Sequence, residues 1–339
     1  MARYWILLQS INNDEVIAAP IDIQQLWNLP KENFLRVSRT VFQWQAKHNE
    51  VYKQWVQLNK ASAKELITIP FLPISFFKTQ EVIIGPKPIT LFESSGTTQD
   101  IVSKHWVQNT ALYEQSFLNG FELVYGAPSN YCIIGLLPSY LERANSSLVY
   151  MVNQLIQASG HEESGFYLDD FKKLDAVLKK LENEKQQVWL IGVSFALTDF
   201  AAAYPQKLVY TTVVETGGMK GRKKELTREE LHEVLTTNFG TPTIHSEYGM
   251  TELLSQAYAI KEGVFKCPPW MKVLVADEED PIELKETGRG ILHIIDLANL
   301  YSCSFIATED LGEVYDDGSF KVLGRIDSSA RRGCSLLVV

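Results

Sequence analysis

The fold is decided by the stretch Gln187-Val188-Trp189-Leu190-Ile191-Gly192, a short and almost uninterrupted apolar run. Such a run is typical of a strand that is buried on both faces of a parallel sheet. Two similar runs lie at residues 131–137 and 207–212. We therefore expect buried strands at all three places.

Amphipathic stretches alternate with these runs. Residues 146–158, 169–184 and 197–204 have helical spacing, and Thr227 is a candidate N-cap for a helix that follows. This alternation predicts an α/β fold with a mainly parallel sheet and flanking helices. After about Tyr258 the pattern changes to strands and turns, and the expected strands are 271–276, 290–296, 302–307 and 319–323.

Ahead of the sheet, residues 30–61 show apolar positions near a 3.6-residue spacing and predict a helix. Residues 67–78 form a proline-containing segment that we expect to be extended. The expected organisation is an N-terminal helical region (1–66), an α/β nucleotide-binding body (67–258) and a β-rich C-terminal part (259–339).

The bulk composition is that of an ordinary globular protein, with 45% hydrophobic and 22% charged residues in a chain of 339. The net charge is −9 with acids and bases interspersed, so no basic surface indicates nucleic-acid binding. No apolar run reaches the roughly 20 residues that span a bilayer. The four cysteines are scattered and form no CxxC pair, which favours a reducing, cytoplasmic setting.

A hydroxyl- and glycine-rich loop follows the strand-like residues 88–92. Glycine lets a backbone approach phosphate oxygens closely, and hydroxyl and N–H groups can donate to them. A solvated surface loop is the alternative interpretation. The candidate phosphate-binding residues are Ser94, Ser95, Gly96, Thr97 and Thr98.

The most specific motif is EYGMTE at residues 247–252, after a strand-like segment. Tyr248, followed by Gly249, can stack on adenine. Thr251 can donate to a phosphate, and Glu252 can ligate magnesium, a cation that prefers oxygen ligands. Thr-Glu is also a common helix start, which is the structural alternative.

Three weaker segments complete the candidate site. A glycine-rich segment that includes Gly217, Gly218 and Met219 follows the apolar run at residues 207–212. Its backbone is expected to pass close to adenine; a flexible connection is the alternative. In TEDLG (308–312) and GRID (324–327), Asp310 would accept from ribose hydroxyls and Arg325 would reach the ribose or a phosphate; solvated acidic turns are the alternative. Tyr140 lies in residues 136–143, where a predicted strand ends, and is a candidate substrate-pocket residue; a turn that only ends the strand is the alternative.

The cysteines differ in their surroundings. Cys132 lies in an apolar run and is expected to be inert core. Cys334 follows Arg331 and Arg332, whose charges would favour a nucleophilic thiolate. A buried place in a final apolar strand is the alternative for Cys334.

Together with residues 69–73 and 76–78, these motifs resemble the LuxE-type acyl-protein synthetases of the adenylate-forming superfamily, relatives of the phenylacetate–CoA ligases. The resemblance covers the chain from about Ile67 to its end. It implies that a fatty acid is activated with ATP to acyl-AMP and that the acyl group moves to a cysteine near the C-terminus, where Cys334 matches. It also implies that Ser95, Thr97 and Thr98 contact phosphates and that Tyr248 contacts adenine. Glu252 would bind magnesium, and Asp310 and Arg325 would contact the ribose.

One departure from the superfamily concerns the part after GRID. Most members continue with a small mobile domain that carries a lysine assisting adenylation, and we expect that domain to be absent here. Arg325, Arg331 or Arg332 could replace the lysine, a partner could supply it, or adenylation could be slow.

The sequence therefore predicts an ATP- and Mg²⁺-dependent ligase that acts on a small-molecule carboxylic acid and acylates its own Cys334. One alternative is transfer of the acyl group to coenzyme A or a carrier protein. Another is a degenerate nucleotide- or acyl-binding subunit without activity. An acyl-acceptor or acyl-donor protein is the partner class left open, and neither nucleic acid nor a membrane span is expected.

Overall fold

The computed structural model describes residues 17–59, 63–95, 101–137, 145–168, 170–217, 226–277 and 283–326. The first part contains α1 (Ile23–Leu26), the 3-10 turn η1 (Lys31–Asn33), α2 (Phe34–His48), α3 (Glu50–Asn59), η2 (Leu66–Thr68), β1 (Leu72–Pro73) and α4 (Phe76–Thr79). Then come β2 (Leu91–Glu93) and β3 (Lys104–Trp106), an antiparallel pair, and α5 (Thr110–Tyr125).

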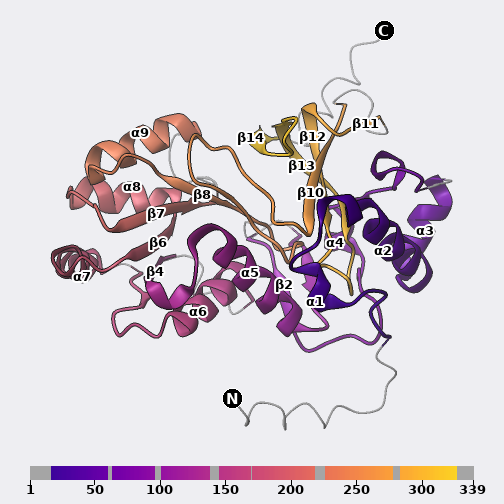
Figure 1. Cartoon of the computed structure of the whole chain (residues 1–339), viewed down its shortest axis with the longest axis horizontal. Helices are drawn as coiled ribbons and strands as arrows, with labels where there is room; N and C mark the ends of the chain where they lie inside the picture. Colours follow the sequence, from indigo (N-terminus) through magenta and orange to yellow (C-terminus); the bar gives the residue numbers. More distant parts are fainter. Residues whose placement is uncertain are drawn as a thin grey trace.

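The α/β body follows. Its elements are η3 (Pro128–Asn130), β4 (Cys132–Leu136), α6 (Ser147–Ser159), β5 (Gly165–Phe166), α7 (Phe171–Glu184), β6 (Val188–Val193), α8 (Ser194–Ala203), β7 (Thr211–Thr216), α9 (Arg228–Phe239), β8 (His245–Tyr248) and β9 (Ala257–Ala259). The strands lie in the order β5-β4-β6-β7-β8-β9, and each pair is parallel except β8 with β9. Helices cover both faces of the sheet, with α8 and α9 above it and α5 and α6 below it in Figure 1.

A second sheet forms the C-terminal part. It contains β10 (Met271–Ala276), β11 (Leu284–Lys285), β12 (Gly288–Asp296), β13 (Phe305–Val314) and β14 (Phe320–Arg325). These strands pair antiparallel, and β1 from the first part of the chain adds to β13 in parallel. The helices α2, α3 and α4 lie beside this sheet (Figure 1).

Burial explains why the apolar runs form the central strands. Every residue of β4 and of β6 is buried, and Trp189, Leu190 and Ile191 have no exposed surface. Strands that are covered by helices on both faces need apolar side chains in both directions, so alternation disappears. The predicted α/β fold with its mainly parallel sheet is confirmed.

Helix ends also follow the sequence signals. Thr227 caps α9: its side chain accepts from the backbone N–H of Glu230, and the Glu230 carboxylate accepts from the N–H of Thr227. This reciprocal pair satisfies two donors that the helix itself leaves without partners. The N-cap predicted at Thr227 is confirmed.

The predicted helix over residues 30–61 is wrong in one respect, because it breaks at Asn49. Asn49 is extended, its Oδ1 accepts from the N–H of Tyr52, and its Nδ2 donates to the carbonyl of Ser302. A buried amide that caps α3 and also pairs with a distant loop stabilises the break.

Two strand predictions were displaced. The strand expected at 207–212 begins only at Thr211, since the N–H groups of Val209 and Tyr210 donate to the Glu182 carboxylate of α7 instead of entering the sheet. The strand expected at 302–307 lies at Phe305–Val314 instead and contains residues 308–312, for which a solvated acidic turn was the alternative interpretation. The helix α5 was not predicted, although its buried positions Leu112, Tyr113, Ser116, Phe117, Gly120 and Phe121 follow helical spacing.

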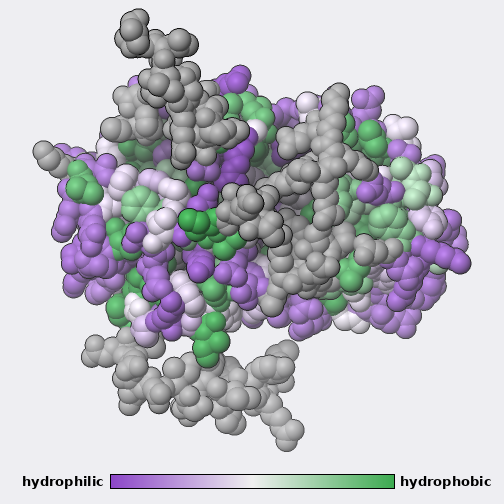
Figure 2. Space-filling model, turned by 180° about the vertical axis from the view of Figure 1, so that it is seen from behind, coloured by the Kyte–Doolittle hydropathy of each residue, from purple (hydrophilic) through white to green (hydrophobic). Residues whose placement is uncertain are grey.

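The described surface is mixed in character. Hydrophilic residues are spread over the face shown in Figure 2, with small hydrophobic areas between them. Within the described ranges, every helix is too short or too polar to cross a bilayer.

Candidate nucleotide-binding site

The candidate site begins where β7 and β8 end, at the carboxyl edge of the parallel strands. In open α/β sheets ligands bind outside this edge. Gly217 directly follows β7 with φ of +71°, a left-handed conformation that favours glycine, and its carbonyl accepts from the hydroxyl of Ser194 at 2.8 Å. Gly218 and Met219, which were assigned to the same segment, lie outside the described residues.

Tyr248 is the last residue of β8 and joins the two sheets. Its hydroxyl donates to Oδ2 of Asp310 in β13 at 2.8 Å. Its ring packs against Phe265 and Phe320, with ring centroids 5.8 and 5.4 Å away. Burial, together with the neighbouring Asp310 carboxylate, raises the pKa of Tyr248 well above its ordinary value, so the hydroxyl keeps its proton. The adenine and ribose candidates are thus in direct contact.

Asp310 and Arg325 lie directly opposite each other on β13 and β14. The Arg325 guanidinium, half exposed, donates from Nη2 to Oε2 of Glu309 at 3.1 Å. The backbone N–H of Asp310 donates to the hydroxyl of Thr308, which itself donates to the carbonyl of Leu292. Antiparallel pairing therefore brings the two weakest sequence motifs together.

Thr251 and Glu252 lie in the segment after β8. Thr251 is half-buried, and Glu252 is only 5% exposed. Burial raises the pKa of the Glu252 carboxyl, whereas a hydrogen bond with the Ser103 side chain and the positive charge of Arg325 act in the opposite direction. A carboxylate removed from water in this way gains from a nearby cation.

Ser103 connects Glu252 to the hydroxyl-rich loop. The N–H of Ser103 donates to the hydroxyl of Ser94 at 2.9 Å, and the N–H of Ser94 donates to the carbonyl of Ser103 at 3.0 Å. Ser94 and Ser95 are half-buried. The start of the first motif and the end of the second therefore meet through Ser103, a residue that sequence reasoning missed. The rest of the loop, Gly96, Thr97 and Thr98, lies outside the described residues.

Glu247 is a second residue that the sequence did not single out for a role. It is 7% exposed, and the Thr216 hydroxyl donates to its Oε2. Burial, assisted by the negative charge of Glu215, raises the pKa of Glu247 to about 7. Glu247 lies in β8 and pairs with Thr216 of β7, which puts a titrating carboxyl at the carboxyl edge of the sheet. The signal that could have identified it was an acid directly before the tyrosine of the motif.

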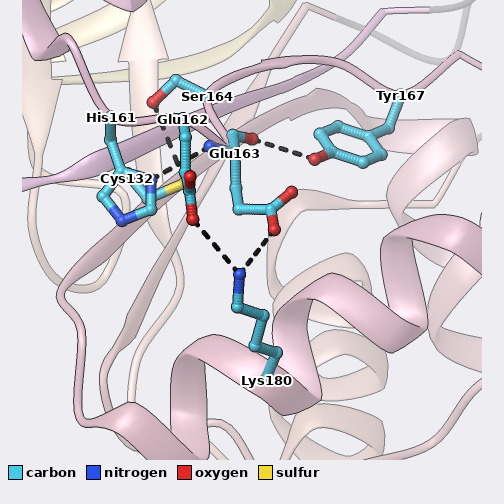
Figure 3. A network of polar contacts seen from close by, with 7 residues as sticks. All are labelled: Cys132, His161, Glu162, Glu163, Ser164, Tyr167 and Lys180. Carbon is cyan, nitrogen blue, oxygen red and sulfur yellow. Dashed lines mark hydrogen bonds and ion pairs between the residues drawn. The ribbon is translucent and has the colours of Figure 1, made fainter.

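Cys132, the cysteine expected to be inert core, lies within the described residues. Cys132 starts β4 and has no exposed surface, and the Ser164 hydroxyl donates to its Sγ at 3.8 Å within a polar network that includes Lys180 and two glutamates (Figure 3). Burial raises the pKa of Cys132 to about 11, which suppresses the thiolate and confirms the expectation of an inert core cysteine. Cys334 and Tyr140 lie outside the described residues.

Solved structures with a similar fold include the ATP-bound form of MatB from Rhodopseudomonas palustris, with a TM-score of 0.54 and 16% sequence identity. The match covers 69% of this chain and 47% of MatB, so the chain spans about half the length of that enzyme. An ATP-bound chimera of MatB and BclM gives the same TM-score and identity, over 72% of this chain and 49% of its own. These matches show that the chain shares the fold of these solved structures.

Among curated proteins, the long-chain-fatty-acid–luciferin-component ligase of Aliivibrio fischeri is 22% identical over 345 residues, which covers 92% of this chain and 90% of that protein. The family model described as "Acyl-protein synthetase, LuxE" matches residues 24–339. The match extends across the N-terminal helices, which contributed little to the resemblance found from the motifs. The prediction of a ligase of this type is confirmed, and the chain belongs to the LuxE family of acyl-protein synthetases.

Proposed function

We propose that this protein activates a fatty acid with ATP and transfers the acyl group to its own Cys334. In the first step, a carboxylate oxygen attacks the α-phosphorus of ATP. An acyl–phosphate bond forms, the bond between the α- and β-phosphates breaks, and pyrophosphate leaves. In the second step, the Cys334 thiolate attacks the acyl carbon, the acyl–AMP bond breaks, and AMP leaves; the thiol proton has already passed to solvent.

The observation that carries the activation step is the convergence of the sequence motifs. Ser103 links Ser94 to the nearly buried Glu252. Tyr248 links the carboxyl edge of the parallel sheet to Asp310, opposite Arg325. These residues supply phosphate donors, an acid for ribose hydroxyls and a guanidinium within one region, which is the chemistry that a nucleoside triphosphate requires.

Magnesium fits the same region through Glu252. Mg²⁺ is usually held by one or two carboxylates together with substrate phosphates rather than by an all-protein cage. Glu252 is a carboxylate whose burial raises its pKa, and a divalent cation would compensate its charge. In this proposal Glu252 would hold the metal, which would supply neutralisation of the phosphate charge, and Thr251 would donate to a phosphate.

The reported relatives support the nature of the substrate. The A. fischeri protein is named for a long-chain fatty acid, which favours an aliphatic acid over other carboxylates here. Self-acylation needs a free thiol, so a reducing, cytoplasmic compartment fits the proposal. The described cysteines Cys132, Cys267 and Cys303 form no disulfide.

The test is acyl labelling with intact-mass analysis. The protein is incubated with MgATP and a panel of short-chain, long-chain and aromatic acids. We expect one hydroxylamine-sensitive acyl adduct on the wild-type protein. Cys334→Ser should still release pyrophosphate and form acyl-AMP while losing the adduct.

Cys132→Ser is the matched control, because Cys132 is buried with a raised pKa and should not accept the acyl group. It should label like the wild type, although with reduced thermal stability. An adduct at another residue, or wild-type labelling of Cys334→Ser, would refute the transfer step. Pyrophosphate release without any protein adduct, but with acyl-CoA formed when coenzyme A is added, would identify a CoA ligase instead.

A further inference from the structure

Buried side chains from distant parts of the chain hold the main chain of residues 249–255, the segment that carries Thr251 and Glu252. This segment runs between β8 and β9 outside regular secondary structure. Its backbone groups therefore need partners from elsewhere, since buried unpaired carbonyl and N–H groups are costly. Those partners are His105, Asn299 and Asp296.

His105 comes from β3 and has no exposed surface. Its Nδ1 lies 2.8 Å from the carbonyl oxygen of Thr251, and its Nε2 lies 3.2 Å from Oδ1 of Asn299. Both ring nitrogens face oxygens, and a neutral ring can donate from only one of them. Burial lowers the pKa of His105 to about 4, so the ring is neutral near pH 7. We assign the ring proton to Nδ1, because its contact with the Thr251 carbonyl, which can only accept, is the shorter of the two.

Asn299 lies in the loop between β12 and β13 and is 1% exposed. Its Nδ2 donates to the carbonyl of Glu252 at 2.8 Å. The loop is itself fixed by the buried Gln45 of α2, whose Nε2 donates to the carbonyls of Asn299 and Leu300 at 3.0 and 2.7 Å. The hydrogen bonds from Gln45 of α2 thus fix the position from which the Asn299 amide contacts the segment.

Asp296, the last residue of β12, fixes the other end of the segment. One carboxylate oxygen, Oδ2, accepts from the N–H groups of Leu254 and Ser255 at 2.8 and 3.0 Å. The other, Oδ1, accepts from the Ser255 hydroxyl at 2.6 Å and from the N–H of Ala298 at 3.1 Å. Asp296 has no exposed surface, so these bonds are shielded from competing water.

We propose that His105 and Asn299 are positioning residues of the nucleotide site, and that the Nδ1–H of His105 sets the backbone on which Glu252 is presented to MgATP. This inference rests on the proposed function of Glu252. A ligand-binding carboxylate must be held to within fractions of an ångström, and side chains locked by buried hydrogen bonds achieve this. His105 and Asn299 act through the carbonyls of Thr251 and Glu252 and do not themselves touch the nucleotide.

Three substitutions of His105 separate hydrogen bonding from packing. In His105→Asn, the amide nitrogen takes the place of Nδ1; in His105→Gln it takes the place of Nε2; His105→Ala has neither. Calorimetric titration with MgATP should give near-wild-type affinity for His105→Asn. We expect about tenfold weaker binding for His105→Gln and His105→Ala, as for the loss of one buried hydrogen bond.

His293→Asn is the matched control. His293 is a buried histidine of β12 whose Nδ1 also faces a backbone carbonyl, that of Ile291 at 3.2 Å, but its contacts are within the second sheet and with Phe71. Its substitution should lower the melting temperature and leave MgATP affinity unchanged. Asn299→Asp provides a second test, because it replaces the donor to the Glu252 carbonyl by an acceptor and should also weaken MgATP binding.

The outcomes distinguish the inference from the proposed function. A wild-type protein that does not bind MgATP would refute both. If the wild type binds but all three His105 variants bind equally, or if His105→Gln is the variant that keeps affinity, the positioning role of Nδ1 is wrong. Should His105→Ala fail to fold, the comparison of His105→Asn with His105→Gln still decides the question.

Discussion

The hydroxyl of Tyr248 donates to Oδ2 of Asp310 at 2.8 Å, across 62 residues of sequence. The bond connects the carboxyl end of β8 in the parallel sheet with β13 in the second sheet. It also places the residue proposed for adenine against the residue proposed for ribose. The orientation of the Asp310 carboxylate therefore depends on the tyrosine hydroxyl.

Replacing Tyr248 by phenylalanine should destabilise the protein and weaken ATP binding. A hydrogen bond to a charged group contributes about 1.5–3 kcal/mol, and the ring itself is retained in Tyr248→Phe. We expect the free energy of unfolding in urea to fall by about that amount.

Tyr258→Phe is the control for this substitution. The Tyr258 hydroxyl is buried and has no hydrogen-bond partner among the described residues. Its removal should leave stability unchanged or slightly increased. Equal effects of the two substitutions would show that the Tyr248–Asp310 bond contributes nothing.

Asp310 should make the protein selective for an intact ribose. If its carboxylate accepts from the ribose hydroxyls, ATP should bind about ten- to a hundredfold more tightly than 2′-deoxy- or 3′-deoxy-ATP. Competition binding with the three nucleotides measures the preference. Asp310→Ala should bind all three with similar affinity, and equal binding of both deoxy analogues by the wild type would assign Asp310 another role.

Glu252→Gln should reduce MgATP affinity far more than it changes stability. Because burial raises the pKa of the Glu252 carboxyl, the folded protein disfavours its charged form, so a neutral amide of the same shape should not lower stability; loss of a metal ligand, in contrast, removes a coordination bond. Calorimetry with and without Mg²⁺ separates the metal-dependent part. Glu283→Gln, at an exposed glutamate paired with Lys285, is the matched control and should bind like the wild type. A Glu252→Gln variant with wild-type affinity would remove Glu252 from the metal site.

Glu247 should make stability depend on pH between about 4.5 and 7. Burial raises its pKa from 4.5 to about 7, so in this window the folded state holds a proton that the unfolded state has released. Stability contributed by such a group is complete below about pH 4.5 and is lost as the pH rises. The full shift corresponds to about 3 kcal/mol.

Glu247→Gln, which cannot titrate, isolates this effect. The difference in unfolding free energy between Glu247→Gln and the wild type should move in favour of the variant as the pH rises through the window. Urea unfolding at several pH values measures it. A difference that stays constant from pH 4.5 to 8 would mean that Glu247 is ionised throughout.

Much of the fold was determined by local sequence patterns. The apolar runs at Tyr131–Leu137 and Gln187–Gly192 gave buried strands because every side chain of such a strand meets a covering helix. The capping pair of Thr227 and Glu230 was readable because it lies within four consecutive residues. Of the site, the motif carrying Tyr248 and Glu252 was identified for the same reason: residue types and spacing are local properties.

The tertiary structure decided what the side chains touch. Ser103 beside Glu252, Tyr248 on Asp310 and His105 on the carbonyl of Thr251 are contacts between distant segments, which hydrophobic periodicity does not encode. The break at Asn49 has the same origin, since a carbonyl 253 residues away takes part in stabilising it. Residue types thus determined which chemistry was available. Burial and cross-strand pairing decided which groups could act together, because hydrogen bonds and desolvation depend on position in space rather than in sequence.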